Sequence, residues 1–214
     1  MRKLATAIVV AALVLTGCSP DSDEPIDPST ARTISSDRQI GPVATGELLN
    51  KISAAMQKAG TFTATSHAEL TGANGVRVTD TTARHDFTNP DEHRMHLVST
   101  SDGETLEVIV IGLTTWTRQN DALWTRTDTV ADPTVLFPDG TDGSYVAREK
   151  ISGRKLHHYR YAASPATIDL YLDDDDLPRL TITTTNGSPL VISYTGYGDP
   201  VEINEPDPAQ VTQG

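Results

Sequence analysis

The sequence predicts a mostly β domain of the α+β class, with one N-terminal amphipathic helix and a curved antiparallel sheet of about ten strands. Two observations predict this class. Apolar residues recur at spacings of three and four in residues 43–59, which is the period of a helix with one buried face. From residue 61 onward, apolar and polar residues alternate in short runs that are separated by turn residues, as they do in antiparallel strands.

The first residues have the pattern of a lipoprotein signal peptide. The basic start Met1-Arg2-Lys3 precedes a run from Leu4 to Leu15 that is apolar apart from Thr6, and Leu15-Thr16-Gly17-Cys18 follows the pattern of a bacterial lipobox. We therefore expect residues 1–17 to be a signal peptide and Cys18 to be the first mature residue, joined to a diacylglyceryl group through its sulfur. The predicted location is the extracytoplasmic face of the cell membrane, to which the lipid anchors the chain.

Two other interpretations of this start are weaker. A membrane-spanning helix needs roughly 20 apolar residues, and the run here has about 12. A plain secretory signal would leave the one cysteine of the chain as a free thiol in an oxidising compartment. Lipid attachment at Cys18 accounts for that cysteine and for its place directly after Leu-Thr-Gly.

The mature chain is acidic, because removing Arg2 and Lys3 leaves 15 basic and 29 acidic residues and a formal net charge of −14. Nucleic acid is not an expected partner, since its phosphates require clustered Lys and Arg. No basic stripe is visible along the sequence, so we do not expect charge alone to bind anionic lipid headgroups. With a single cysteine, neither a disulfide framework nor a thiolate metal site is expected.

Composition divides the mature chain into three parts. Residues 18–42 are rich in Pro, Ser, Asp and Thr, so we expect a flexible tether. Residues 43–206 carry the periodic patterns and form the predicted domain. Residues 207–214 are Pro- and Gln-rich, and we expect a disordered tail.

The predicted helix covers residues 43–59. Thr45 is the expected cap at its start, Glu47 suits its first turn, and Gly60 is the expected stop. The face that should be buried consists of Leu48, Leu49, Ile52, Ala55, Met56 and Ala59.

The predicted strands form a meander. They cover residues 61–70, 76–87, 94–100, 106–111, 114–118, 123–126, 155–163, 167–172, 179–185 and 190–195. Trp116 and Trp124 lie on one short hairpin, where paired tryptophans more often pack in a core than bind a ligand. Residues 128–144 interrupt the meander with prolines, glycines and aspartates, and no helix is expected there.

We found no catalytic or metal-binding pattern, so we expect no enzyme activity, no cofactor and no metal. His93 and His96 would lie on opposite faces of a strand, as would His157 and His158, which argues against zinc. The four aspartates at 173–176 lack the spread ligands and internal glycine of an EF-hand loop, so a solvated turn is favoured over calcium.

Several segments in this order resemble actinobacterial lipoproteins of the LppX/LprG type, which have the LolA-like fold. They are Glu47-Leu48-Leu49 through Ala59-Gly60-Thr61-Phe62, the stretch from Gly112 to Arg126, Ile168 to Asp173 with Leu177-Pro178, and Tyr194 through Val201. The resemblance implies a curved half-barrel closed over helices, with an apolar cavity that holds an acyl chain or a lipoprotein. Residues expected to line that cavity or its mouth are Leu48, Ile52, Met56, Leu106, Val108, Val135, Leu136 and Phe137.

Two functions remain open at this stage. The first is a membrane-anchored protein that binds a lipid or another amphiphile and carries it between membrane and envelope. The second is an interaction or sensor module without a ligand, which docks another envelope protein. The sequence departs from the family at residues 128–144, where members usually carry a further helical segment, and the apolar triplet 135–137 there is either a cavity mouth or ordinary core.

Overall fold

The structure is a computed structural model that describes residues 26–34, 40–72, 75–128 and 136–213. The predicted signal peptide, Cys18 and Val135 lie outside these residues. No helix within the described ranges is long and apolar enough to cross a membrane.

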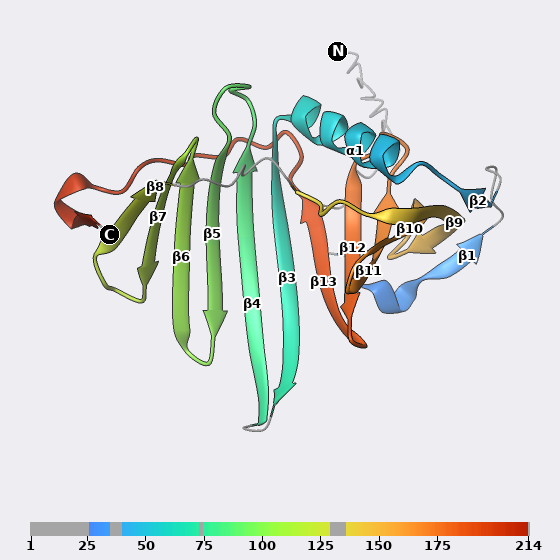
Figure 1. The fold of residues 1–214 in the computed structure, drawn as a ribbon, viewed down its shortest axis with the longest axis horizontal. Coiled ribbons are helices and arrows are strands. Elements are labelled where there is room, and N and C mark those ends of the chain that lie inside the picture. Colours follow the sequence, from blue (N-terminus) through green and yellow to red (C-terminus); the bar gives the residue numbers. More distant parts are fainter. Residues whose placement is uncertain (1–25, 35–39, 73–74, 129–135, 214) are drawn as a thin grey trace, which may run out of the picture.

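One sheet of fourteen strands dominates the described part of the chain (Figure 1). Its order is β1-β9-β10-β11-β12-β13-β3-β4-β5-β6-β7-β8-β14, and β2 also pairs with β9. All neighbouring strands are antiparallel except β14 and β8. The strands are β1 (Arg32–Ile34), β2 (Gly41–Pro42), β3 (Thr61–Gly72), β4 (Gly75–Asp86), β5 (Arg94–Ser101), β6 (Glu104–Ile111), β7 (Thr114–Gln119), β8 (Trp124–Asp128), β9 (Thr141–Ile151), β10 (Arg154–Ala163), β11 (Ala166–Leu172), β12 (Pro178–Thr185), β13 (Ser188–Thr195) and β14 (Val211–Gln213).

The single α-helix of the described residues, α1 (Thr45–Ala59), confirms the predicted helix and its buried face. Leu48, Ile52 and Met56 are buried along it. The predicted cap is wrong, because Ala44 occupies the cap position, no side chain caps the helix, and Thr45 is buried in the first turn. Gly60 ends the helix as predicted, with a φ of 82° that favours glycine and its N–H directed at the carbonyls of Met56 and Gln57.

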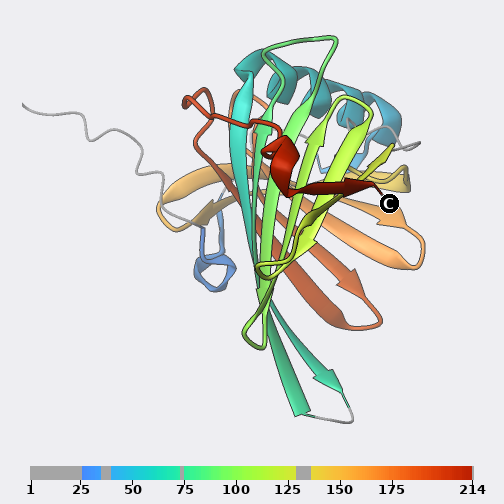
Figure 2. The same ribbon diagram turned by 90° about the vertical axis from the view of Figure 1, so that its left-hand side faces the viewer.

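The sheet curves around the helix. α1 packs against both β3 and β9, which are several positions apart in the strand order, so the strands between them bend around it. Figure 2 shows the strands of the two halves of the sheet running in different directions, as strong sheet twist requires. The predicted mostly β half-barrel closed over an N-terminal helix is thereby confirmed.

The main core lies between α1 and strands β9–β13 and β3. It is rich in aromatic rings and contains Leu48, Ile52, Met56, Phe62, Phe87, Phe137, Tyr145, Tyr159, Tyr161, Ile168, Leu170, Leu172 and Tyr194. Ile52 and Met56 are 0% exposed. This part of the half-barrel is therefore filled by the protein's own side chains.

Two chain ends cover the opposite face of the sheet. Near the N-terminus, Ile26 precedes the 3-10 turn η1 (Pro28–Thr30) and packs with Ile151, Leu156, Tyr171 and Leu180. Near the C-terminus, Val201, Ile203 and Val211, the last just after η2 (Pro208–Gln210), pack with Ile109, Ile111, Trp116 and Trp124. The prediction that the tryptophans pack in a core is confirmed.

These ends correct two expectations. Residues 26–34 and 40–42 pair with β9 or pack beside it, so the flexible tether expected over 18–42 does not extend over them. Residues 207–213 form η2 and β14 instead of a disordered tail. The physical reason is the same in both places. Strands β9 and β8 offer unpaired backbone N–H and C=O groups, and a polar segment can pair with them because backbone hydrogen bonds do not require apolar side chains.

The ten predicted strands are all present as β3–β8 and β10–β13, but β9 was missed. Its sequence, Thr-Asp-Gly-Ser-Tyr-Val-Ala-Arg-Glu-Lys-Ile, has an incomplete alternation because Val146 interrupts it and charged residues follow. Pairing on both sides with β1 and β10 holds this segment extended. Pairing with neighbouring strands thus determines the extended conformation of this segment, whose local sequence pattern is weak.

Candidate functional site: the inner trough

We call the face of the sheet that carries α1 the inner face. Across β3–β7, the side chains on this face change from apolar to polar along the strands. Phe62 lies on this face, since it packs in the core with α1. Residues paired across strands share a face, so the register extends it in four successive rows. The rows are Phe62, His85, Met95, Val110 and Thr115; Ala64, Ala83, Leu97, Val108 and Thr117; Ser66, Thr81, Ser99, Leu106 and Gln119; and Ala68, Thr79, Ser101 and Glu104.

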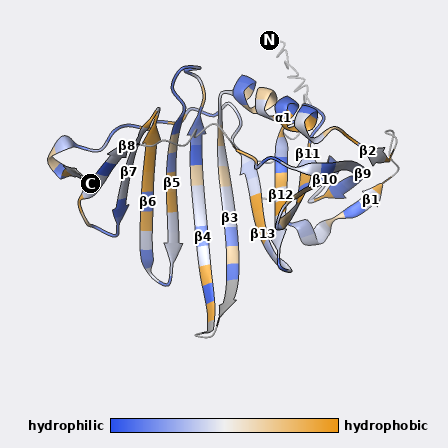
Figure 3. Ribbon diagram, viewed as in Figure 1, coloured by the Kyte–Doolittle hydropathy of each residue, from blue (hydrophilic) through white to orange (hydrophobic). Residues whose placement is uncertain are grey.

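The first two rows are mainly apolar and only partly covered. Ala83 and Val110 are buried, whereas Met95, Leu97 and Val108 are half-buried. None of these five belongs to the three core clusters of the described residues. Figure 3 shows the hydrophobic stretch along β6 that supplies part of this surface. We call the apolar part of these two rows the inner trough.

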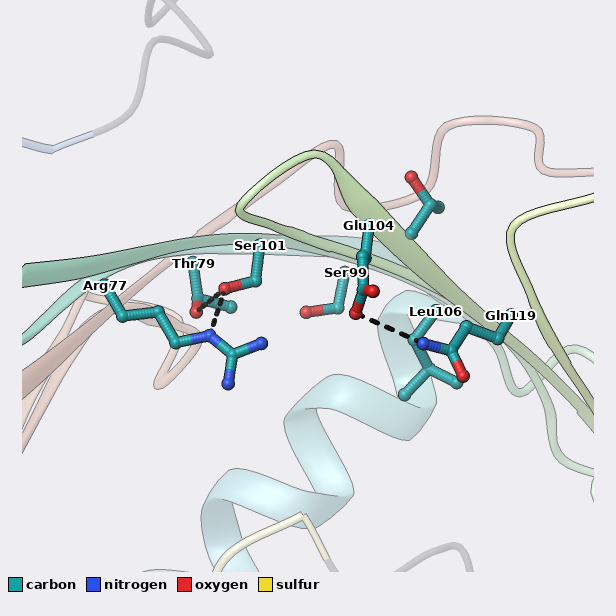
Figure 4. A pocket seen from close by; sticks show the side chains of 8 residues that line it. Arg77, Thr79, Ser99, Ser101, Glu104, Leu106 and Gln119 are labelled. Atoms are coloured by element: carbon teal, nitrogen blue, oxygen red, sulfur yellow. Dashed lines mark hydrogen bonds between the residues drawn. The ribbon is translucent and has the colours of Figure 1, made fainter. Parts of the chain in front are cut away.

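The next two rows end in a polar pocket of about 350 Å³ beside the trough (Figure 4). Its hydroxyl and charged groups are already linked, because Arg77 Nε donates to Ser101 Oγ at 2.7 Å and Gln119 Nε2 donates to Glu104 at 3.2 Å. Leu106 is 45% exposed and lies at the boundary between the apolar and the polar rows. The inner face therefore changes from apolar to polar over about four residues, or roughly 13 Å of strand.

The trough ends toward α1 at a stack of buried rings. His85 stacks on Phe62 with ring centroids 4.4 Å apart, and His93 stacks on Phe87 at 4.1 Å. His85 Nδ1 and His93 Nε2 are 3.1 Å apart and share a hydrogen bond. Burial, and secondarily the neighbouring His93, lowers the pKa of His85 to about 3.

The predicted site residues fall into three groups. Leu106 and Val108 lie on the inner face of β6. Leu106 lies beside the trough, and Val108 lies in it. Leu48, Ile52, Met56 and Phe137 lie in the main core, with Leu136 packed against it. Val135 and the predicted anchor residue Cys18 lie outside the described residues.

Four trough residues were not selected from the sequence: Ala83, Met95, Leu97 and Val110. The alternation of Met95 and Leu97 along their strand was visible and would have placed them on one face. What the sequence lacks is the pairing of that face with Ala83 and Val110 on the neighbouring strands, which makes the residues one surface.

The other residues considered for chemistry have structural partners. His96 pairs with Glu107 at 2.7 Å. His157 and His158 point to opposite faces as predicted, with His157 3.1 Å from Asp174 and His158 2.6 Å from Asp169. Burial alone would raise the pKa of Asp169, but hydrogen bonds from His158 and Arg160 hold it below its ordinary value.

The aspartate tetrad forms the turn between β11 and β12. Asp173 accepts hydrogen bonds from the backbone of Asp175 and Leu177. Arg179, Arg148 and Lys51 pair with Asp173, Asp174 and Asp176, respectively. Over the described ranges, no three His, Cys, Asp or Glu side chains are grouped so that they could hold a metal ion.

No protein-family model matches the sequence, and no curated protein matches it. The fold is similar to that of LprF from Mycobacterium bovis, with a TM-score of 0.53 and 11% identity over 78% of this chain and 99% of that one. The LolA superfamily protein NE2245 from Nitrosomonas europaea gives a TM-score of 0.40 at 9% identity, over 72% of this chain and 92% of that one. The likeness to LprF shows that the chain has an LprF-like fold, in agreement with the fold that the sequence resemblance implied.

Proposed function

We propose that this chain is a membrane-anchored lipoprotein that binds a lipid or another amphiphile in the inner trough. The observation that carries the proposal is the change from apolar to polar rows across β3–β7, on a fold similar to that of LprF. The lipobox-like sequence before Cys18 supports the membrane anchor.

The trough suits a hydrocarbon chain because its half-buried groups are aliphatic. Leu97, Val108 and Met95 are partly exposed to solvent. When an acyl chain covers them, apolar surface of both the protein and the ligand is removed from water. Each methylene group buried in this way contributes about 0.8 kcal/mol. About ten methylene groups supply the free energy of micromolar binding, and further groups are needed to offset the free energy lost on association, so a long acyl chain is required.

The polar rows give the ligand a direction. An amphiphile whose tail lies over Leu97 and Val108 places its polar end near Ser99, Ser101 and the pocket of about 350 Å³. Ser101 is already bonded to Arg77, Thr79 and the Val78 carbonyl, whereas Ser99 and Thr81 share one hydrogen bond and keep further capacity, so these two are the hydroxyls that can bond a polar headgroup. Carriage of the ligand between membrane and envelope follows from the anchor and is part of the same proposal.

A trough variant tests the proposal directly. The double substitution Leu97→Ser and Val108→Ser should weaken the binding of a fluorescent fatty acid about ten-fold, because it makes the centre of the trough polar. The matched control is Val98→Ser, a half-buried residue of the same strand on the opposite face. Equal affinity for the double variant and the control would exclude the trough as the binding site.

The second candidate function is docking of another envelope protein without a lipid. It is favoured by the filled core, because Ile52 and Met56 are fully buried and leave the half-barrel closed beneath α1. Native mass spectrometry of the protein purified from its own host separates the two functions. A bound lipid that is lost from the Leu97 and Val108 double variant supports the carrier, and a bound protein with no lipid supports the docking module.

A further inference from the structure

Three basic side chains lie in register at one edge of the sheet. Arg32 on β1 pairs with Lys150 on β9, and Lys150 pairs with Lys155 on β10. Side chains paired in this way lie on one face with Cβ atoms about 4.5–5.5 Å apart. All three are exposed, and we call them the basic row. Figure 1 shows β1, β9 and β10 at the end of the sheet opposite β8.

The basic row has no carboxylate partner in the part of the chain that the structure describes. Two of the nearby acidic groups pair with other cations, since Asp174 pairs with Arg148 at 2.9 Å and Asp173 pairs with Arg179 at 2.8 Å, whereas the exposed Asp175 lines the same hollow as Lys155. Like charges directly opposite each other on neighbouring strands repel. The cluster stands out because the whole chain has a formal net charge of −12.

The row is bordered by two hollows on either side of the β9–β10 turn. One, of about 540 Å³, is lined by Arg32 and Lys150 together with the hydroxyls of Ser29, Thr30 and Ser152. The other, of about 480 Å³, is lined by the cations Lys155, Arg154 and Arg179 and by the carboxylates of Asp173, Asp174 and Asp175, so its charges are mixed. Within the described residues, Nη2 of Arg154 is buried without a hydrogen-bond partner. In the first hollow, Thr30 and Ser152 already donate to the Asp27 carbonyl, so Arg32 and Lys150 are the groups there that can bind phosphate.

The basic row lies close to the proposed lipid anchor along the chain. Eight residues join Cys18 to Ile26, and they span at most about 26–29 Å when fully extended. Asp27 is held to the β9–β10 turn, because its N–H donates to Ser152 Oγ at 3.0 Å. This inference rests on the proposed anchor at Cys18. With that anchor in the membrane, the β9–β10 turn lies no farther from the lipid surface than residues 18–26 can reach.

We propose that the basic row binds the phosphate groups of anionic phospholipids in the membrane to which the chain is anchored, and so orients the domain. The β1–β9–β10 edge then faces the lipid, while the trough strands β3–β7 follow β9–β13 in the strand order and lie farther from that edge. A Lys or Arg at an anionic surface strengthens binding about five-fold, so the three together contribute about 100-fold at low salt. High salt removes most of this effect.

Lysine labelling of the lipidated protein in vesicles tests the orientation. In phosphatidylglycerol vesicles, acetylation of Lys150 and Lys155 should be several-fold slower than in phosphatidylcholine vesicles, and high salt should abolish the difference. Lys58 is the internal control, because it is exposed in the last turn of α1 and does not belong to the strands of the row. Retention of the protein on the neutral vesicles shows in the same sample that the lipid anchor holds. A failed anchor is thereby distinguished from a failed orientation proposal. Equal labelling rates in both lipids would overturn the proposal.

Partial neutralisation of the basic row and competition by free phosphate complete the test. With Arg32→Gln and Lys150→Gln combined, protection of Lys155 on anionic vesicles should fall, while the melting temperature stays equal or rises because repulsion is removed. Protection that survives this variant overturns the proposal. Millimolar inorganic phosphate with neutral vesicles should not protect the lysines; if it protects them as well as the anionic lipid does, the row is a site for free phosphate and not for the membrane.

Discussion

His85 is the residue at which burial most directly sets a property of the molecule. Its ring lies between aromatic neighbours, stacked on Phe62 and hydrogen-bonded to His93. The lowered pKa of about 3 means that the folded protein holds this ring neutral at any pH at which an exposed histidine would titrate. The unfolded chain binds a proton there that the folded chain does not, so acid favours unfolding at this site.

We expect His85→Phe to make the protein less sensitive to acid. Below the unfolded pKa of 6.5, the wild type loses about 1.4 kcal/mol of stability per pH unit at this residue until the folded pKa of about 3 is reached. From pH 6.5 to 5 the free energy of unfolding should therefore fall by about 2 kcal/mol more in the wild type than in the variant. Urea unfolding at a series of pH values measures this.

The control for that experiment is His67→Gln, which removes an exposed histidine. Hydrogen bonding to Asp80 raises the pKa of His67, so its contribution has the opposite sign and its removal cannot reduce the acid sensitivity. If His85→Phe and the wild type show the same slope of stability against pH, the neutral buried state assigned to His85 is wrong.

Among the structural elements, α1 depends on a close approach to β9. Gly143 near the start of β9 lies under the first turn of the helix, where an added Cβ would come within 2.6 Å of Thr45 Oγ1 and 2.8 Å of the Val43 carbonyl. The N–H of Val43 also donates to the Gly143 carbonyl at 2.8 Å. The glycine thus fixes where the helix begins relative to the sheet, and this explains the burial of Thr45.

Gly143→Ala should destabilise the protein by about 1–3 kcal/mol, because the backbone of the helix start must move away from β9. Gly46→Ala is the matched comparison, since the same Cβ added within α1 meets nothing within 4 Å. That substitution should stabilise by up to about 1 kcal/mol through helix propensity. Thermal unfolding of both variants checks the pair, and equal effects of the same sign would contradict the close approach.

In the whole molecule, three regions with different roles follow one another along the sheet. The filled core under α1 supports the half-barrel, the trough on β3–β7 is proposed to hold an amphiphile, and the β1–β9–β10 edge is proposed to face the membrane. Because the trough and the basic row lie on different strands, each can be altered without loss of the other. The lipid anchor at Cys18 is proposed to keep both at the membrane.

Cys18→Ala should release the protein from the membrane fraction and leave the domain folded, because the substitution removes the sulfur that would carry the lipid. The domain itself is described from residue 26 onward and does not include that position. Fractionation after a high-salt wash, with circular dichroism of the released protein, measures both parts. Retention of the variant at the wild-type level would exclude lipid anchoring through this cysteine.

The residues of a single strand or helix could be predicted from their own pattern. The helix that ends at Gly60, the ten alternating strands and the tryptophan hairpin were predicted in this way, since each depends on neighbours only a few residues away. The strand β9 and the ordered ends at residues 26–34 and 207–213 were not, because they are held by pairing with strands distant in sequence.

The sequence by itself determined the class of the fold, the buried face of α1 and the expectation of a lipid anchor, all of which follow from local periodicity or a contiguous motif. Only the tertiary structure decided which faces combine. The trough joins Ala83, Leu97 and Val108 from three strands, and the basic row joins Arg32, Lys150 and Lys155 from three others. This row is not visible along the sequence, because cross-strand register brings together Arg32 and Lys150, which are more than 100 positions apart.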